Sequence, residues 1–159
     1  MSKPKILAHG FYWQDLEVGQ EFLTFGRTIT EADLIGFITV TGMTEMLFTN
    51  TLHKGAIEGR IVPAALSYTI IEGLLVQGMI QGTGLALLEV HKKLLSPVRV
   101  GDTIHGHVLV TEIKPTSKPG RAVVTCEVTV LKQDDTAAMT YTVKRLMAGD
   151  PAKTGEAAA

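Results

Sequence analysis

Cysteine is almost absent from this 159-residue chain, since Cys126 is the only one and no internal disulfide can form. An excess of either charge is also absent, because 15 basic and 16 acidic side chains leave a net charge of −1. Such a chain has no overall field that attracts nucleic acid or an anionic membrane. The early apolar run Ile6–Ala8 stops at His9, so no signal peptide is apparent. We therefore expect a cytoplasmic protein that binds neither nucleic acid nor membranes.

A long unbroken apolar run is missing too. The most apolar stretch, Ile61–Ile80, is interrupted by two glycines, Glu72 and Gln77. A membrane-spanning helix needs about 20 predominantly apolar residues, whereas a helix that is apolar nearly all round can also be a buried core helix. Pro63 suits the first helical position, where its missing N–H has no partner to lose. The stretch therefore predicts a central helix, in which Glu72 is paired or partly exposed rather than catalytic.

Alternating side chains and turn residues dominate the second half of the chain. Apolar residues recur at every second position between clusters rich in Gly, Pro, Ser and Asp, the pattern of antiparallel strands with one buried face. The expected strands are 85–95, 103–114, 121–132 and 136–147, after a first strand at 21–28. One such sheet around one helix is an α+β fold. We expect a single domain over residues 1–148 and a flexible C-terminal tail over 149–159.

The segment between that first strand and the central helix carries a clear helix signal. Thr30 and Asp33 form a capping box, and Gly42 suits the left-handed residue that ends a helix. Residues 43–60 then form a long loop, and long ordered loops in compact domains are often functional. The open edge of a single sheet predicts a homodimer or higher homo-oligomer, with an aromatic arm at Phe11–Trp13 tied to the core or to a partner.

Three stretches together resemble the MaoC-like acyl dehydratases, the hot-dog fold group that includes the (R)-specific enoyl-CoA hydratases. Residues 97–103 (PVRVGDT) match the PV-x-x-GDT turn of that family, and 18–37 (from VGQEF to TITEADLIGF) resemble its N-terminal segment. Residues 59–62 (GRIV) resemble its approach to the central helix. The resemblance covers roughly residues 16–147. It implies a hot-dog fold and an acyl thioester, such as an acyl-CoA, as the ligand.

The residues that carry the chemistry of that family are replaced in this chain. A Gly-Asp-x-Asn-Pro-x-His segment supplies an Asp and a His that activate water, but here Met43 and Phe48 occupy those two positions. Hydration of an enoyl thioester needs a base and an acid, and a thioether or a phenyl ring is neither. Replacing both members of a buried polar pair by apolar groups can be nearly neutral for stability. The pair therefore predicts a drier pocket in which ordinary hydration is absent or weak.

Two weaker candidates for acid–base work lie in the same loop. Glu45 and His53 could act as a relocated pair, although loop residues of this kind are more often solvated. Several cations could contact coenzyme A phosphates, although any soluble protein carries such scattered charges: Lys54, Arg60, Lys92, Lys93 and Arg99. His105 and His107 alternate on one strand without a third ligand, so we expect no metal. The resemblance gives no reason to expect a cofactor.

Anion binding by the start of the central helix needs no particular side chain. Free N–H groups at a helix N-terminus favour a developing oxyanion or a thioester carbonyl. We therefore expect Met43, Phe48, Pro63, Ala64 and Ala65 to bind the substrate. Whether the protein is an enzyme stays open among three hypotheses: a hydratase with relocated groups, a hot-dog thioesterase, and a non-catalytic acyl-thioester-binding or assembly subunit.

Overall fold

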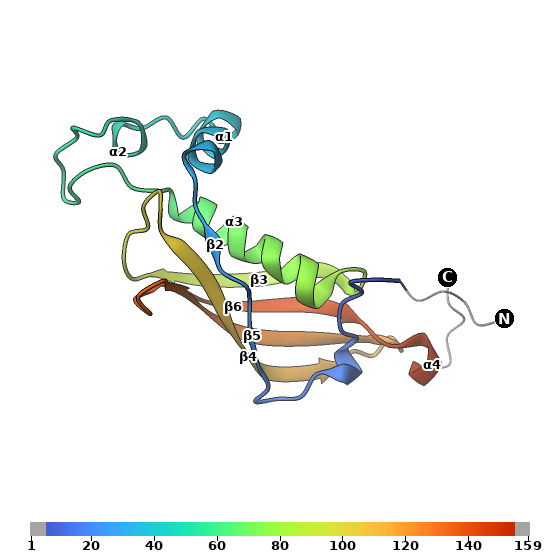
Figure 1. The fold of residues 1–159 in the computed structure, drawn as a ribbon. Coiled ribbons are helices and arrows are strands. Elements are labelled where there is room, and N and C mark those ends of the chain that lie inside the picture. The colour runs from blue at the N-terminus through green and yellow to red at the C-terminus, as the bar shows by residue number, and fades with distance from the viewer. Residues whose placement is uncertain (1–5, 155–159) are drawn as a thin grey trace.

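The computed structural model describes residues 6–154 and shows one antiparallel sheet with a long helix lying across it (Figure 1). The strands follow one another in space in the order β1-β4-β5-β6-β3, and β2 also pairs with β4. Their bounds are β1 (Glu21–Leu23), β2 (Arg27–Thr28), β3 (Gly84–Leu94), β4 (Thr103–Pro115), β5 (Arg121–Lys132) and β6 (Ala137–Ala148). The predicted α+β hot-dog arrangement is confirmed.

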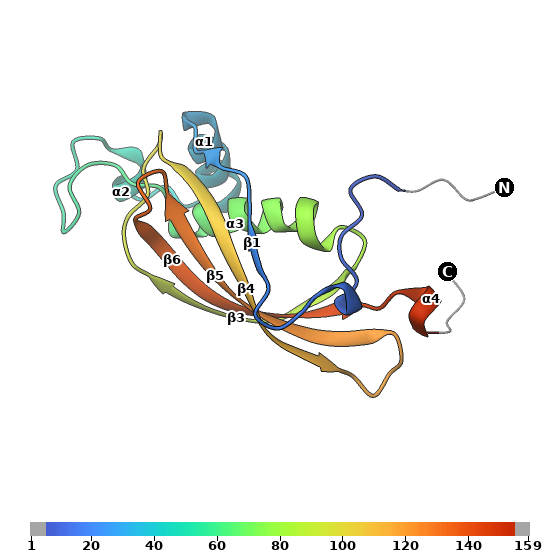
Figure 2. The same ribbon diagram turned by 60° about the horizontal axis from the view of Figure 1, so that its bottom comes forward.

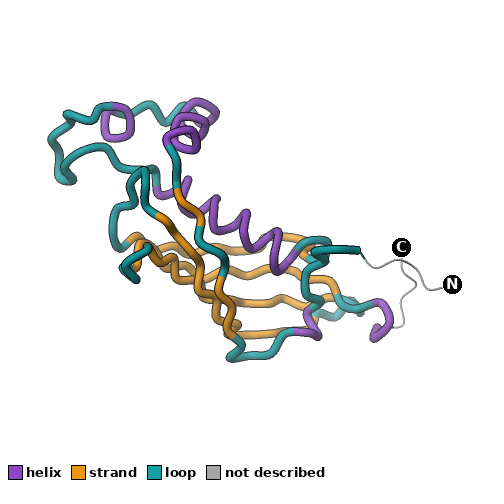
Figure 3. The backbone as a smooth tube through the Cα atoms, in the orientation of Figure 1, coloured by secondary structure: helices purple, strands orange, loops and turns teal. Residues whose placement is uncertain are grey.

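The helices lie on one face of this sheet and at its ends (Figure 3). The central helix begins as α3 and continues without a break into a π-helical segment, η2. The helical elements are η1 (Trp13–Asp15), α1 (Glu31–Thr41), α2 (Met46–Thr49), α3 (Ala64–Leu75), η2 (Val76–Ile80) and α4 (Pro151–Thr154). None of the helices in the described residues is long and apolar enough to cross a membrane.

The central helix, α3 with η2, packs on the sheet through side chains that recur every four or five residues. Ile71 is fully buried, and Leu66, Leu75 and Met79 are nearly so. Gly106 of β4 permits the close contact, because a Cβ built at this glycine lies only 3.0 Å from Cγ2 of Ile71. The turned sheet in Figure 2 shows the strands passing beneath the whole length of α3. Burial of this stripe is the main apolar contribution of the helix to stability.

The opposite face of the central helix is open in a single chain. Ala65, Thr69, Val76 and Gln77 are all exposed there. The expectation of a buried core helix is therefore met on only one side of the helix in a single protomer, because the sheet covers only that side.

Helix α1 begins and ends as its sequence predicts. The Asp33 N–H donates to the Thr30 hydroxyl, and Asp33 in turn accepts hydrogen bonds from the backbone and side chain of Thr30. Those bonds, led by the one from the Thr30 hydroxyl, lower the pKa of Asp33. Gly42 has φ of 71° in the left-handed region that ends the helix.

Three sequence predictions need correction. The strand expected over 21–28 is broken into β1 and β2, because Thr24 exchanges hydrogen bonds with Gly106 through both its N–H and its hydroxyl. The loop over 43–60 contains the short helix α2. Pro63 precedes the helix as its N-cap rather than occupying its first position.

The expected tail begins with residues that are tied to the N-terminal segment. The Asp150 N–H donates to Oε1 of Gln14 at 2.9 Å, and Lys153 lies 3.1 Å from the Asp15 carboxylate. Gly149 leaves no room for a Cβ beside the Trp13 indole, at 2.8 Å. Residues 149–154 are therefore held by these contacts, while 155–159 lie outside the described residues.

The edge of the sheet at β3 is unpaired on its outer side. β3 pairs only with β6 within residues 6–154. Large apolar side chains cluster along and just after this strand and are about half exposed, namely Leu85, Leu87, Leu88, Leu94 and Leu95. An open edge of this kind is a surface on which a further strand can pair.

We predict that Ile71→Ala lowers the free energy of unfolding by about 2–5 kcal/mol, the usual range for removing a large buried aliphatic side chain. Gln77→Ala is the matched control, because Gln77 is an exposed residue of the same central helix. Its free energy of unfolding should stay within about 0.5 kcal/mol of the wild type. Chemical denaturation of the three proteins measures both. Equal midpoints for the two variants would contradict the packing described for α3.

Candidate functional site

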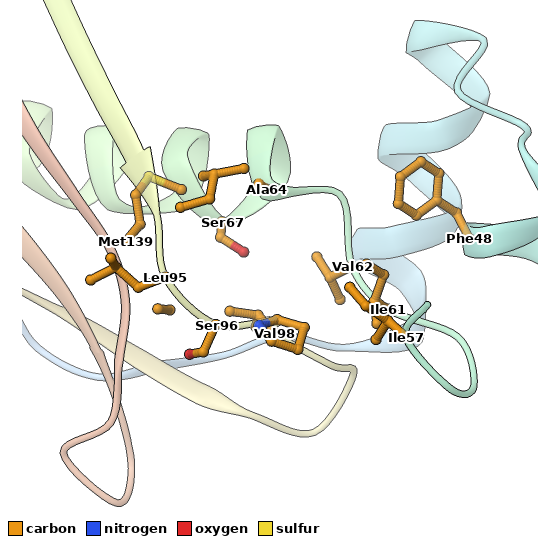
Figure 4. A pocket seen from close by; sticks show the side chains of 13 residues that line it. Phe48, Ile57, Ile61, Val62, Ala64, Ser67, Leu95, Ser96, Val98 and Met139 are labelled. Atoms are coloured by element: carbon orange, nitrogen blue, oxygen red, sulfur yellow. The ribbon is translucent and has the colours of Figure 1, made fainter. Parts of the chain in front are cut away.

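A cavity of about 350 Å³ lies where the start of α3 meets the segment that follows β3 (Figure 4). Its walls come from four separate parts of the chain and are almost entirely apolar. The lining residues are Phe48, Ile57, Ile61, Val62, Ala64, Ser67, Leu94, Leu95, Ser96, Pro97, Val98, Ala138 and Met139. An apolar cavity with a few polar groups is the usual form of a small-molecule site.

The N-terminus of α3 forms one end of this cavity. The backbone N–H groups of Leu66 and Ser67 both donate to the carbonyl of Pro63, at 2.9 and 3.4 Å. The N–H groups of Ala64 and Ala65 precede them and have no acceptor within the helix. Ala64 lies on the cavity wall, whereas Ala65 is exposed. The positive end of the helix dipole therefore lies beside the apolar space.

The turn that follows β3 joins three parts of the fold. The Val98 carbonyl accepts from the Val62 N–H at 2.8 Å, which ties the approach to α3 to this turn. Asp102 accepts from the Arg99 N–H at 2.8 Å and from the Gln133 amide at 2.9 Å. Gly101 has φ of 94°, which a side chain would strain. The PVRVGDT stretch thus holds the cavity wall in place while its Pro97 and Val98 line it.

Two arginines fix the long loop over this end of the molecule. The guanidinium of Arg99 donates to the carbonyls of Glu58 and Arg60, at 2.7 and 3.2 Å. Arg60 itself forms an ion pair with Glu31 of α1. Both arginines therefore have contacts within the chain, and their role toward a phosphate stays a prediction.

The residues predicted to bind substrate do not all reach the cavity. Phe48 and Ala64 line it, and Pro63 is buried next to them as the N-cap of α3. Met43 is 36% exposed and is not part of the lining. Figure 4 shows the Phe48 ring at the loop side of the cavity, across from the sheet. One of the two dyad positions therefore contributes an apolar wall.

The two candidates for relocated acid–base chemistry lie apart from this space. Glu45 is exposed and caps α2, where its carbonyl accepts from the Phe48 N–H at 2.9 Å. His53 is half-buried in the loop, with its ring against Gly55. Neither side chain lines the cavity. The geometry of a single chain gives them no position from which to act on a ligand held there.

Several lining residues could not be recognised from the sequence as site residues. Ile57, Leu95, Ser96 and Met139 come from a loop, a strand end and β6, and only the folded chain brings them together. Ser67 carries the one signal that the sequence offered, a hydroxyl one turn after the expected anion-binding helix start.

Glu72 is held by a polar cluster deeper along α3. Its carboxylate accepts from the Tyr141 hydroxyl at 2.8 Å and from Nη2 of Arg145 at 2.5 Å. Burial, followed by the neighbouring carboxylate, raises the pKa of Tyr141, so that it remains a hydrogen-bond donor. The predicted pairing of Glu72 is confirmed. The pair joins the middle of the helix to β6.

Cys126 and the histidines add no reactive centre to the described part of the chain. Burial raises the pKa of the Cys126 thiol to about 11, so it is protonated at neutral pH and unsuited to nucleophilic attack. Within residues 6–154 no three His, Cys, Asp or Glu side chains lie close enough to hold a metal ion. His107 pairs with Glu21 across β4 and β1 at 2.5 Å.

No family model matches the sequence, and no curated protein matches it. Solved structures do match the fold. A MaoC-like dehydratase from Rhodospirillum rubrum superposes with a TM-score of 0.80 at 23% identity, over 89% of this chain and 99% of that one. An (R)-hydratase from A. caviae involved in PHA biosynthesis gives 0.68 at 25% identity, over 86% and 99%.

A third match defines the fold class by its own description. A conserved hypothetical protein of Mycobacterium tuberculosis with a double hotdog fold gives a TM-score of 0.78 at 16% identity. The match covers 89% of this chain and 45% of that one, so this chain corresponds to one of the two halves of a double hot-dog. The chain is a single hot-dog fold, and its structural likeness is to MaoC-like dehydratases and (R)-hydratases.

We predict that Glu72→Ala lowers the free energy of unfolding by about 3–5 kcal/mol, because it strands the Arg145 guanidinium, which is 7% exposed. The double variant Glu72→Leu with Arg145→Met removes both charges and should recover most of that loss. Thermal and denaturant unfolding measure the two differences. A double variant as unstable as the single one would show that the pair contributes through its shape and not through its charges.

Proposed function

We propose that this protein binds an acyl thioester in the cavity at the start of α3, without hydrating it by the usual dyad. The observation that carries the proposal is the apolar cavity itself, which ends at the free N–H groups at the start of α3 and has Phe48 in its wall. Such a site fits a ligand with one apolar arm and one polarised carbonyl.

The helix start supports binding of the carbonyl end of the ligand. In the proposed complex the thioester carbonyl accepts from the N–H groups at Ala64 and Ala65, and the acyl chain enters the cavity between Val62 and Met139. These donors belong to the backbone, so they are available whatever side chains stand at Ala64 and Ala65. The MaoC-like and (R)-hydratase names of the structural neighbours favour the same ligand class.

The wall chemistry argues against hydration in this site. A positioned acid or base contributes about 10²–10⁴ to the rate of proton transfer, and the lining of the cavity contains no titratable side chain. Glu45 and His53, the relocated candidates, lie outside that lining. Among the three hypotheses, the geometry therefore favours a non-catalytic acyl-thioester-binding or assembly subunit over a hydratase. A thioesterase would need a base to activate one of the two lining hydroxyls, Ser67 or Ser96, and the lining contains no such group.

Self-association is the second part of the proposal. The unpaired edge of β3 carries half-exposed leucines, and Val76 of η2 lines one hollow with Leu85 and Leu87 of that strand, so a second copy would cover this surface. Pairing of two β3 strands would satisfy the edge N–H and carbonyl groups. A homodimer formed in this way would also enclose the side of the cavity formed by Leu94 and Leu95. The cytoplasmic location stays a prediction.

The ligand class is tested by titrating the protein with saturated and 2-enoyl acyl-CoA thioesters in a calorimeter. We expect binding by the wild type and at least tenfold weaker binding by Phe48→Asp, which places a charge in the wall. Met46→Asp is the matched control in the same short helix, since Met46 is 60% exposed and outside the lining. Absence of binding by the wild type to every thioester would overturn the proposal.

The absence of hydration is measured on the same protein with crotonyl-CoA. We expect no turnover above the uncatalysed rate in the wild type, Glu45→Gln or His53→Asn. Wild-type turnover that either substitution lowers by about 10² would instead establish relocated acid–base chemistry and reject the binding-only hypothesis.

Sedimentation at micromolar concentration tests the assembly. We expect a species of about twice the 17.1 kDa chain mass, and dissociation in Leu87→Lys, because an edge lysine disfavours strand pairing. Phe25→Lys is the control, since Phe25 is 91% exposed and lies between β1 and β2, away from β3. A wild-type monomer, or equal dissociation of both variants, would contradict pairing through β3.

A further inference from the structure

One hydroxyl in the cavity wall has no partner. Ser67 of α3 is 1% exposed, and its Oγ forms no hydrogen bond with any atom of residues 6–154. Figure 4 shows this oxygen turned from the helix toward the space between Val62 and Ser96. A buried hydroxyl without a partner costs free energy, since it has given up its hydrogen bonds to water.

Three threonine hydroxyls in the helices of this chain are satisfied by the helix itself. Thr41 donates to the Phe37 carbonyl at 2.6 Å and Thr49 to the Glu45 carbonyl at 3.0 Å. Thr69, two residues after Ser67, donates to the Ala65 carbonyl. This bond to the carbonyl four residues back is the usual solution for a helical serine or threonine. The corresponding carbonyl for Ser67 is that of Pro63, and the Ser67 hydroxyl does not donate to it.

The second hydroxyl of the cavity, that of Ser96, is not a partner for Ser67. Ser96 donates its own hydroxyl to the Ala137 carbonyl at 2.9 Å and so fixes the turn after β3. The remaining side chains of the lining are apolar. Ser67 is therefore the one unpartnered side-chain polar group that the described residues place on this apolar wall.

We propose that Ser67 is a specificity-determining residue whose hydroxyl forms a hydrogen bond with an oxygen atom on the bound acyl chain. The inference rests on the proposed function, because it assigns a role to a residue of the same cavity. It adds a preference that the apolar walls alone cannot provide, for an acyl chain that carries a hydroxyl or keto oxygen over a saturated chain of equal length.

The position of Ser67 along α3 sets where that oxygen lies. Ser67 follows Ala64 by three residues, which is about 4.5 Å along the helix axis. A thioester carbonyl at the Ala64 N–H thus leaves Ser67 beside a carbon further along the chain, not beside the carbonyl. The saturated ligand would leave the hydroxyl unpaired in the complex, and a site with a buried unpaired polar group discriminates against such a ligand.

Calorimetric titration with butyryl-CoA, 3-hydroxybutyryl-CoA and 4-hydroxybutyryl-CoA tests the preference. We expect the wild type to bind at least one hydroxylated ligand about tenfold more tightly than butyryl-CoA. In Ser67→Ala that ratio should fall to about one, mainly through weaker binding of the hydroxylated ligand. Thr69→Ala, the matched control on the same helix, should keep the wild-type ratio because Thr69 is exposed and lies outside the lining.

Thermal unfolding without ligand separates this role from a structural one. Ser67→Ala removes an unsatisfied hydroxyl and should melt at the wild-type temperature or above it, whereas loss of a structural hydrogen bond would lower the melting temperature. Ser67→Cys keeps the size of the side chain but is a weak donor, and should lose the preference as Ser67→Ala does.

The outcomes distinguish the two proposals. Binding of all three ligands with the same ratios in the wild type and Ser67→Ala overturns the role of Ser67 and leaves acyl-thioester binding intact. A wild-type ratio near one does the same. Absence of binding by the wild type to all three overturns the proposed function and this inference with it.

Discussion

The close packing of α3 on β4 is the constraint on which the rest of the structure depends. A glycine at 106 lets Ile71 approach the strand, and the same glycine exchanges hydrogen bonds with Thr24. The central helix, strand β4 and the break between β1 and β2 therefore meet at a single residue without a side chain. Because the helix lies directly on the sheet there, its N-terminus lies in a fixed position beside the turn after β3.

That fixed position allows an apolar site to keep an electrostatic function. The free N–H groups at the start of α3 belong to the backbone, so they persist whatever side chains line the cavity. The charged group of the helix, Glu72, is instead satisfied by Tyr141 and Arg145 of β6. The ion pair of Glu72 with Arg145 thus joins the helix to the sheet and lies apart from the cavity. The polar groups of the cavity are instead the backbone N–H groups and the hydroxyl of Ser67. This separation is consistent with binding of an acyl group without acid–base chemistry.

The sequence predicted the sheet and the first helix well, because those elements depend on local patterns. The alternation over residues 121–132 matches the bounds of β5, and Thr30 with Gly42 delimits α1. The cavity could not be predicted, because Phe48, Val98 and Met139 become neighbours only through tertiary packing. The need of Glu72 for a partner was foreseeable, but Arg145 lies 73 residues away in the sequence. The periodicity of apolar residues predicts which face of a helix or strand is buried, but it does not predict which residues that face contacts.

The contacts at the exit of the central helix bring the two ends of the fold together. The N–H groups of Gly10 and Phe11 donate to the carbonyls of Gln81 and Met79, both at 2.8 Å, and so satisfy the last turn of η2. The segment that follows, at Gln14 and Asp15, holds residues 150 and 153. Residues 10–15 and 150–153 therefore lie on neighbouring parts of the fold, while the loop after α2 is exposed. A circularly permuted chain would join these two neighbouring segments and begin in the loop after α2. It would retain the central helix, the sheet and the register of the strand pairings.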